Sequence, residues 1–162
     1  AYFNLKVANL TGINFAKVSL FAARMQQSDL SEALLDEANL TGADLREANL
    51  QGSKLNQVCL TGADLRKANL SEAELNQADL TWANLQDANL SNAHLKNAIL
   101  TGAKLMNANL AGADLTGADL TDARLDDANL SGAQLTEADL TSAVLTGAVM
   151  PDGQKRESGK IE

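Results

Sequence analysis

Apolar residues recur in this chain with a period of five, which is the period of neither a helix nor a strand. Residues 1–150 divide into thirty groups of five, and the fifth place is Leu in 27 of them. The third place is Ala in 24 of these pentads. The exceptions are Phe15, Met25 and Met150 at the fifth place, and Phe3, Ile13, Val18, Ser28, Ser53 and Val58 at the third. Such regularity predicts an internal repeat, which takes precedence over local propensities.

A period of five excludes both a single long helix and a flat strand. Five residues turn a helix by about 500°, so successive leucines would point to every side of it. In a strand the side chains alternate, so leucines five apart would lie on opposite faces. Ala and Leu of one pentad share a face, however, and a bend in the other three residues can turn the next pair toward the same axis. The pattern therefore predicts a coil wound around its own leucines.

Outward positions show a longer period, and this period gives the size of one coil. Two columns recur every twenty residues at different phases: Thr41, Thr61, Thr81, Thr101, Thr121 and Thr141, and Asn49, Asn69, Asn89, Asn109 and Asn129. Four pentads per coil explain both columns, so we expect a square cross-section and about seven and a half coils. At about 4.8 Å per coil the rod would be roughly 36 Å long. Stacked identical amides should also hydrogen-bond along the rod.

The repeating units resemble those of the pentapeptide-repeat proteins, especially their Leu-centred cyanobacterial type. Ala-Asp-Leu at 43–45 and 63–65 and Ala-Asn-Leu-Ser-Gly at 128–132 carry the resemblance, which extends over all thirty units without an insertion. It implies an all-β fold, namely a right-handed quadrilateral parallel β-helix with Leu and Ala inward. The expected core includes Leu45, Leu65, Leu85, Leu105, Ala43, Ala63, Ala83 and Ala103.

We expect one domain, residues 1–150, followed by a polar tail, residues 151–162, that is either flexible or folded over the last coil. No apolar run approaches transmembrane length. The net charge of −8 argues against binding to nucleic acid or anionic membranes. No targeting segment is visible, so we expect a cytoplasmic location, with the periplasm or thylakoid lumen as alternatives if a signal has been removed.

Candidate catalytic and metal-binding residues are few. The one histidine, His94, would share a column with Glu74 and Asp114, so we interpret it as part of a charge ladder. The one cysteine, Cys59, would lie beside Asp79, and a carboxylate does not activate a thiol as a cation would. A core of Leu and Ala leaves no room for a ligand, and a smooth rod offers no cleft. We therefore predict no enzyme activity, no cofactor and no metal site.

Several outward places carry unexpected apolar side chains, among them Trp82, Ile99 and Met106. Trp82 would lie at a corner of the rod, near Asp79 and roughly one coil from Ile99. We treat these residues as a candidate protein contact, because buried aromatic residues carry much interface energy. The alternative is that they are scattered apolar residues that cover a thin part of the wall.

The leading functional hypothesis is a non-catalytic scaffold or protein-interaction module, with another protein as partner and end-to-end self-association as a further hypothesis. A second hypothesis, by resemblance, is a DNA mimic that inhibits or protects a nucleic-acid enzyme such as gyrase. Mimicry needs a continuous anionic stripe, and the purer acidic run here consists only of Asp79, Asp119, Asp122 and Asp139. A third hypothesis, again by resemblance, is a regulator of cell differentiation or a thylakoid-associated protein of the cyanobacterial type.

Overall fold

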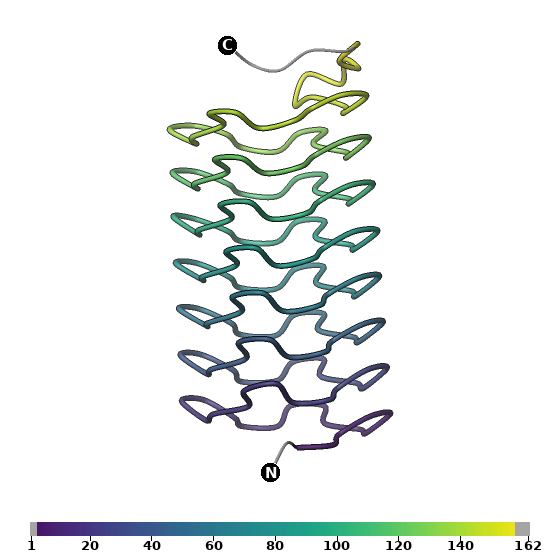
Figure 1. The fold of residues 1–162 in the computed structure, drawn as a ribbon, viewed down its shortest axis with the longest axis vertical. Coiled ribbons are helices and arrows are strands. Elements are labelled where there is room, and N and C mark those ends of the chain that lie inside the picture. Colours follow the sequence, from purple (N-terminus) through teal and green to yellow (C-terminus); the bar gives the residue numbers. More distant parts are fainter. Residues whose placement is uncertain (1–2, 158–162) are drawn as a thin grey trace.

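The computed structural model describes residues 3–157, which form a rod of stacked coils rising from the first residues to the last (Figure 1). The last five residues of the expected tail, 158–162, lie outside the described part. Within residues 3–157, no helix has the length and apolar character needed to cross a membrane. Strands are reduced to single residues, because the fourth residue of each pentad forms an isolated parallel bridge.

The parallel bridges always join residues that are twenty apart. They begin with Asn4 and Arg24 and continue up the rod to Asn129 and Val149. One turn of the coil therefore takes up four pentads, and residues of the same place stack in columns along the axis. This is the spacing that the Thr and Asn columns of the sequence predict.

Each corner of the rod is a β-turn that starts at the fifth residue of a pentad. The N–H of the next third residue donates to the fifth-residue C=O, as from Ala43 to Leu40 at 2.9 Å. The second residue has a positive φ in every pentad from Val7 to Gly147. This combination defines a type II turn, in which Gly is the favoured residue at that place. The glycines at this place have the same conformation, as at Gly42 with φ 64°.

Backbone hydrogen bonds between coils run in both directions along the axis. The fifth-residue N–H donates to the following coil, as from Leu45 to the Asp64 C=O at 2.8 Å. The fourth-residue N–H donates to the preceding coil, as from Asp44 to the Ala23 C=O at 2.9 Å. The second-residue N–H also donates to the following coil, so only the first-residue N–H lacks a backbone acceptor.

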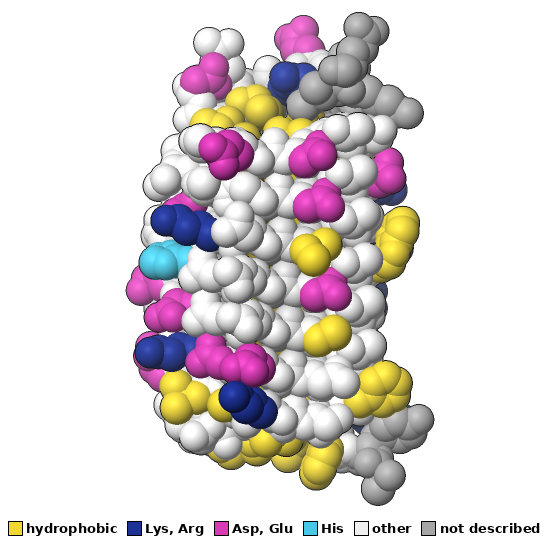
Figure 2. Space-filling model, turned by 90° about the vertical axis from the view of Figure 1, so that its left-hand side faces the viewer, with side chains coloured by type: hydrophobic (Ala, Val, Ile, Leu, Met, Phe, Trp, Pro, Cys, Tyr) yellow, Lys and Arg dark blue, Asp and Glu magenta, His cyan; other side chains and the backbone are white. Residues whose placement is uncertain are grey.

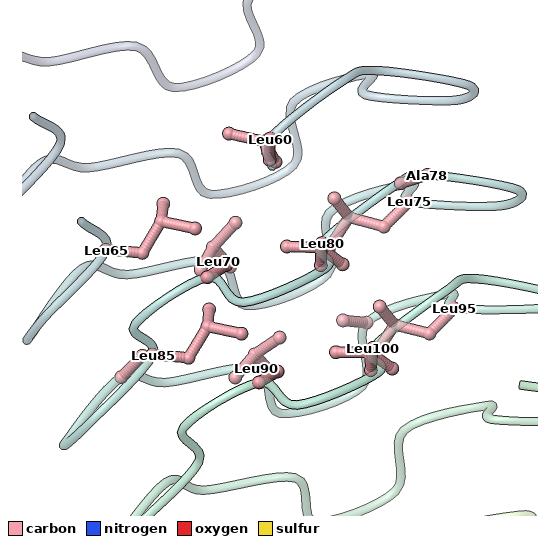
Figure 3. Close-up of a cluster of buried hydrophobic side chains, with 14 of the residues drawn as sticks. Leu60, Leu65, Leu70, Leu75, Ala78, Leu80, Leu85, Leu90, Leu95 and Leu100 are labelled. Carbon is pink, nitrogen blue, oxygen red and sulfur yellow. The ribbon is translucent and has the colours of Figure 1, made fainter. Parts of the chain in front are cut away.

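The third and fifth residues of the pentads fill the interior from the second coil onward (Figure 3). Leu60, Leu80 and Leu100 lie in one row along the axis, as Figure 3 shows. The following side chains are 0% exposed: Leu45, Leu65, Leu85, Leu105, Ala43, Ala63, Ala83 and Ala103. Two serines replace Ala in the core, and each donates its hydroxyl to the turn carbonyl three residues earlier, as Ser53 does to Leu50 at 2.7 Å. The buried hydroxyls are thereby satisfied.

The first coil forms a partly open end layer of the stack. Its larger third-place residues extend beyond the core, so that Phe3 is 52% exposed and Val18 36% exposed. Ile13 and Phe15 are partly buried and pack against the leucines of the second coil. The large third-place residues therefore coincide with the layer that only one neighbouring coil covers.

Residues 151–157 fold back over the last coil. Val149 and Lys155 form an antiparallel bridge, the one such bridge in the part of the chain described. Arg156 donates its N–H to the Ala148 C=O at 2.8 Å. Of the two arrangements that the sequence left open for the tail, the described part adopts the folded one.

Candidate interaction surface

Asn and Asp are frequent at the fourth place because their side chains accept the N–H of the first residue of the next pentad, which has no backbone acceptor. Oδ1 of Asp79 accepts the N–H of Thr81 at 2.9 Å, and Oδ1 of Asn89 accepts the N–H of Ser91 at 3.1 Å. Such bonds to the backbone two residues on are typical of Asx turns. Polar columns on this rod are therefore explained by the turn itself, and an Asn or Asp at this place does not by itself indicate a binding site.

The Asn column forms a continuous amide ladder along one side. From Asn129 to Asn69, each Nδ2 donates to Oδ1 of the Asn one coil nearer the N-terminus, at 3.1–3.2 Å. The last amide of the column, Asn49, donates to Oδ1 of Asp29 at 3.1 Å. This arrangement confirms the predicted ladder and adds a carboxylate at its acceptor end. The Thr column behaves differently, because Thr61 donates to Asp79 of the next coil rather than to another Thr.

A second amide ladder, which the sequence analysis missed, lies at the first place of three successive coils. Asn76 donates Nδ2 to Oδ1 of Asn56 at 3.0 Å, and Asn56 donates to Oδ1 of Asp36 at 3.0 Å. The recurrence of amide and carboxyl side chains every twenty residues would have been the signal. Like the first ladder, it ends on an aspartate. At the end of the first ladder, hydrogen bonds from the hydroxyl and N–H of Ser31 lower the pKa of Asp29.

Acidic residues on the side before the Asn ladder are paired with arginines. Arg46 contacts Asp44 at 2.7 Å, and Arg66 contacts Asp64 at 2.6 Å. The hydrogen bond from Arg46 is the largest influence that lowers the pKa of Asp44, and Arg66 does the same for Asp64. These two carboxylates are therefore neutralised locally and do not form an anionic stripe.

His94 and Cys59 lie in the columns that the sequence predicts. His94 forms bridges to Glu74 and Asp114. Burial is the largest influence on the Cys59 thiol and raises its pKa, but hydrogen bonds with Thr41 and Thr61 together outweigh it, and the pKa is lowered. The charge of Asp79 raises the pKa of the thiol, in the direction that the sequence predicts for a neighbouring carboxylate, and the two threonines, which the prediction did not include, lower it. Across residues 3–157, no group of three or more His, Cys, Asp or Glu side chains could hold a metal ion.

The three apolar candidates do not share one side of the rod. Ile99 is 43% exposed and forms bridges to Asp79 and Asp119 in its column. Trp82 is 62% exposed and belongs to the corner that follows this column. Met106 is partly buried and lies beyond that corner, on the side of the Arg–Asp pairs. The structure therefore groups Trp82 with Ile99 and separates Met106 from both.

The Trp82 ring covers the corner residue of the next coil, Gly102. A Cβ built on Gly102 would lie 2.2 Å from Cζ3 and 2.3 Å from Cε3 of the indole, so that only Gly fits beneath the ring. Gly102 is buried, whereas Gly42 and Gly62 of the same corner are exposed or partly exposed. The indole is therefore held against the wall along one edge and leaves most of its surface to solvent.

Four-pentad coils with a Leu and Ala interior define the protein as a β-solenoid. The family described as Pentapeptide repeats, with 8 copies, matches residues 4–35, 23–62, 49–87, 83–122 and 123–152. The chain belongs to the pentapeptide-repeat family. Proteins of this family are generally non-catalytic structural modules.

Solved structures of pentapeptide-repeat proteins resemble the chain. Rfr23 from the cyanobacterium Cyanothece 51142 is 45% identical, with a TM-score of 0.52, over 52% of this chain and 58% of its own. The chain therefore spans little more than half the length of that relative. A trypsin-treated variant of QnrB1, a plasmid-mediated fluoroquinolone resistance protein, is 17% identical over 93% of this chain and 75% of its own, with a TM-score of 0.83. With the family, these structures imply a right-handed β-helix.

A third solved structure covers almost the whole chain. It is HetL from Nostoc sp. strain PCC 7120, a pentapeptide-repeat protein involved in heterocyst differentiation regulation. It is 35% identical over 96% of this chain and 92% of its own, with a TM-score of 0.35. No curated protein matches the chain.

Proposed function

We propose that the chain is a non-catalytic interaction module, a rigid rod whose outer sides bind another protein. The observation that carries this proposal is the uniform interior, in which Leu and Ala of successive coils are completely buried from residue 20 onward to residue 130 with few exceptions. Such a core places all variable chemistry on the outside. The proposed domain is residues 1–150, about seven and a half coils, with residues 151–162 as a tail.

The proposed protein contacts are Trp82, Ile99 and Met106. In support, Trp82 and Ile99 are exposed at 62% and 43%, whereas the other exposed large apolar residues, Phe3, Val7, Val18 and Phe21, lie at the N-terminal end of the rod. Large aromatic side chains are enriched among the residues that dominate interface energies. Contacts on the sides of a rod also need no cleft, which a catalytic site normally requires.

Binding to a purified partner tests this proposal. The chain, immobilised through its C-terminus, is used to isolate a partner from extract of the source organism, and the partner is then purified and titrated against the wild type. Variants with two outward substitutions on each of the four sides are titrated in parallel. We expect saturable binding with a defined stoichiometry that substitutions on one side weaken. Absence of a saturable complex between the purified components would contradict the proposal.

DNA mimicry is addressed by a supercoiling assay with purified gyrase. Asp44 and Asp64 are paired with Arg46 and Arg66, and the unpaired acidic column of Asp79, Asp119 and Asp139 is interrupted by Ile99, so neither side is a continuous anionic stripe. We therefore expect that adding the chain neither inhibits supercoiling nor protects the enzyme from a fluoroquinolone. A change in either measurement at equimolar protein would favour mimicry over the scaffold.

End-to-end association is proposed as a secondary property of the rod. Leu135 and Leu140 of the last coil are only partly buried, whereas Leu145, beneath the folded-back tail, is 0% exposed. A second copy of the chain that covered Leu135 and Leu140 would bury their exposed surface. Light scattering over a concentration series checks this, and a monomer mass at the highest concentration would exclude it.

A further inference from the structure

One side of the rod carries aspartates and apolar residues but no cation. This acidic–aromatic side comprises the fourth-place column Cys59, Asp79, Ile99, Asp119 and Asp139, the Thr column beside it, and the corner with Trp82, Gly102 and Asp122. Figure 2 shows it right of centre, where acidic and hydrophobic side chains form one vertical row without Lys or Arg. All charged side chains of this row have the same sign.

The aspartates of this side are not neutralised by neighbouring cations. Among residues 3–157, no ion pair includes Asp79, Asp119, Asp122 or Asp139, whereas Asp44, Asp64 and Asp114 each pair with Arg or Lys. On the next side, Lys104 and Arg124 stack in the fourth-place column. Arg124 pairs at 3.2 Å with Asp126, which lies two residues further along the chain. The acidic–aromatic side therefore presents unpaired carboxylates that can form ion pairs with a partner.

Hydrogen bonds from threonines hold these carboxylates in place. Asp119 accepts the N–H of Thr121 at 2.9 Å and the hydroxyl of Thr101 at 3.0 Å. Asp79 accepts the equivalent pair from Thr81 and Thr61. All of these donors are neutral, so they orient the carboxylates without cancelling their charge. Groups oriented in advance lose less conformational freedom on binding.

Trp82 stands at the edge of this acidic row in a costly backbone conformation. Its φ is 57°, a left-handed conformation that is unfavourable for a bulky side chain. Its ring is seated on Gly102, and Ile99 lies in the adjacent column. An exposed indole at the edge of a row of unpaired carboxylates is suited to a cation, because an aromatic face attracts guanidinium and ammonium groups.

We propose that the acidic–aromatic side docks an extended basic segment of a partner protein, with an Arg or Lys stacked on Trp82 and an aliphatic side chain against Ile99. Flanking cations pair with Asp79 and Asp119, which lie two coils apart. Two coils correspond to about 10 Å, the length of roughly three residues of extended chain. Opposite charges steer and align such a segment. The inference rests on the proposed function and adds the chemistry of the partner.

Peptide titration tests the inference with the intact chain. The probe is a fluorescein-labelled peptide of repeated Arg-Leu-Ser units, in which the arginines recur every three residues, and the comparison peptide has Glu in place of Arg. We expect saturable anisotropy with the Arg peptide, weakening with salt, and none with the Glu peptide. Trp82 is the only tryptophan, so its emission should change in an unlabelled titration. Equal binding of both peptides, or no binding of either, would overturn the proposal.

Matched variants show whether binding depends on the residues of this side or only on the net charge of the protein. Trp82→Ser should weaken binding about tenfold, and Trp82→Phe should restore most of it. Asp79→Asn with Asp119→Asn should weaken binding strongly and reduce its salt dependence. The control, Glu47→Gln with Asp87→Asn, changes the net charge equally at an exposed corner elsewhere. Equal effects of the two double variants would contradict the inference.

The outcome also distinguishes this inference from the broader proposal. Circular dichroism and the urea midpoint identify any variant that fails to fold, and the wild-type Trp82 emission change needs no variant at all. If a purified partner binds the rod and the Trp82 and aspartate variants bind it normally, the interaction module stands and this docking side is wrong. If the Arg peptide binds as expected but no protein partner forms a saturable complex, the broader proposal fails instead.

Discussion

At the scale of single residues, one amide of the Asn column satisfies three groups. Asn89 donates to Asn69 at 3.1 Å, accepts from Asn109 at 3.2 Å and also accepts the N–H of Ser91 at 3.1 Å. A side chain with one donor group and one carbonyl therefore joins two coils and completes a turn. This explains why Asn is preferred over other small polar residues in this column.

Replacing Asn89 by Ala should destabilise the rod. The substitution leaves the Ser91 N–H and the Asn109 amide without this acceptor, and unmade bonds of partly buried groups cost about 1–3 kcal/mol. Urea unfolding measures the change. Gln51→Ala on the same side is the control, because this exposed side chain is outside the ladder. An equal effect of both substitutions would contradict the role of the ladder.

Alanine substitutions at two glycines of one corner distinguish the cost of backbone strain from the cost of a clash with a neighbouring side chain. Gly62 and Gly102 have φ of 64° and 65°, but only Gly102 lies under the Trp82 ring. Gly62→Ala should cost about 1–2 kcal/mol through its φ alone. Gly102→Ala should cost about 1 kcal/mol more, because the ring must move. Urea midpoints give both values, and Trp82 emission should shift only in the Gly102 variant. A shift in both variants would show that the Trp82 indole does not lie specifically over Gly102.

At the scale of the pentad and coil, most of the architecture follows from the sequence. Two columns with a period of twenty suffice to predict the coil, because outward residues of the same place contact one another directly. Glycine is the residue that a positive φ favours, yet this conformation occurs at twenty other residues as well. The sequence does not reveal this because core burial and the inter-coil bonds impose the turn on whatever residue occupies the second place.

The sequence predicts less of the candidate interaction surface than of the fold. The neighbourhood of Trp82 and Ile99 follows from the period, but the seating of the ring on Gly102 depends on a rotamer that no pattern encodes. Nor does the sequence say which aspartates are paired, since Asp44 meets Arg46 of the next pentad, whereas Asp119 accepts only from the Thr101 hydroxyl and the Thr121 N–H. These details arise from side-chain packing across corners.

Acid should destabilise the coils through their aspartates. The pKa values are lowered for several: Asp29, Asp44, Asp64, Asp79, Asp114, Asp119 and Asp139. A lowered pKa in the folded state means that the unfolded chain binds more protons in acid, so stability present at neutral pH is lost from about pH 5 downward, through the folded pKa values. Urea midpoints across this range measure the loss. Asp29→Asn keeps the ladder acceptor and should show a smaller loss, and a loss equal to that of the wild type would contradict this assignment.

At the scale of the whole molecule, each coil contacts only the coils before and after it. Stability in such a rod is approximately a sum over coils and their interfaces. The columns add a condition, because their bonds form only when equivalent residues stack. The rod should therefore tolerate a change of length only in whole coils.

Two deletions test this condition. Deletion of residues 61–80 removes one coil and keeps every column in register, so that Asn89 stacks on Asn49. Deletion of residues 61–65 removes fewer residues but moves all later pentads to the next side and breaks the ladders. We expect the shorter deletion to be the less stable of the two, by roughly 2 kcal/mol or more, in urea unfolding. The reverse order would show that the Leu and Ala core alone determines stability.

The ladder that ends on Asp29 also gives the rod an electrical direction. All its amides point their N–H groups toward the first coil, so their dipoles add as peptide dipoles do in a helix. Asp29 is then the counterpart of an acidic residue at a helix N-terminus, a fixed negative charge at the positive pole. The opposite pole at Asn129 is negative, so a cation is favoured at that end.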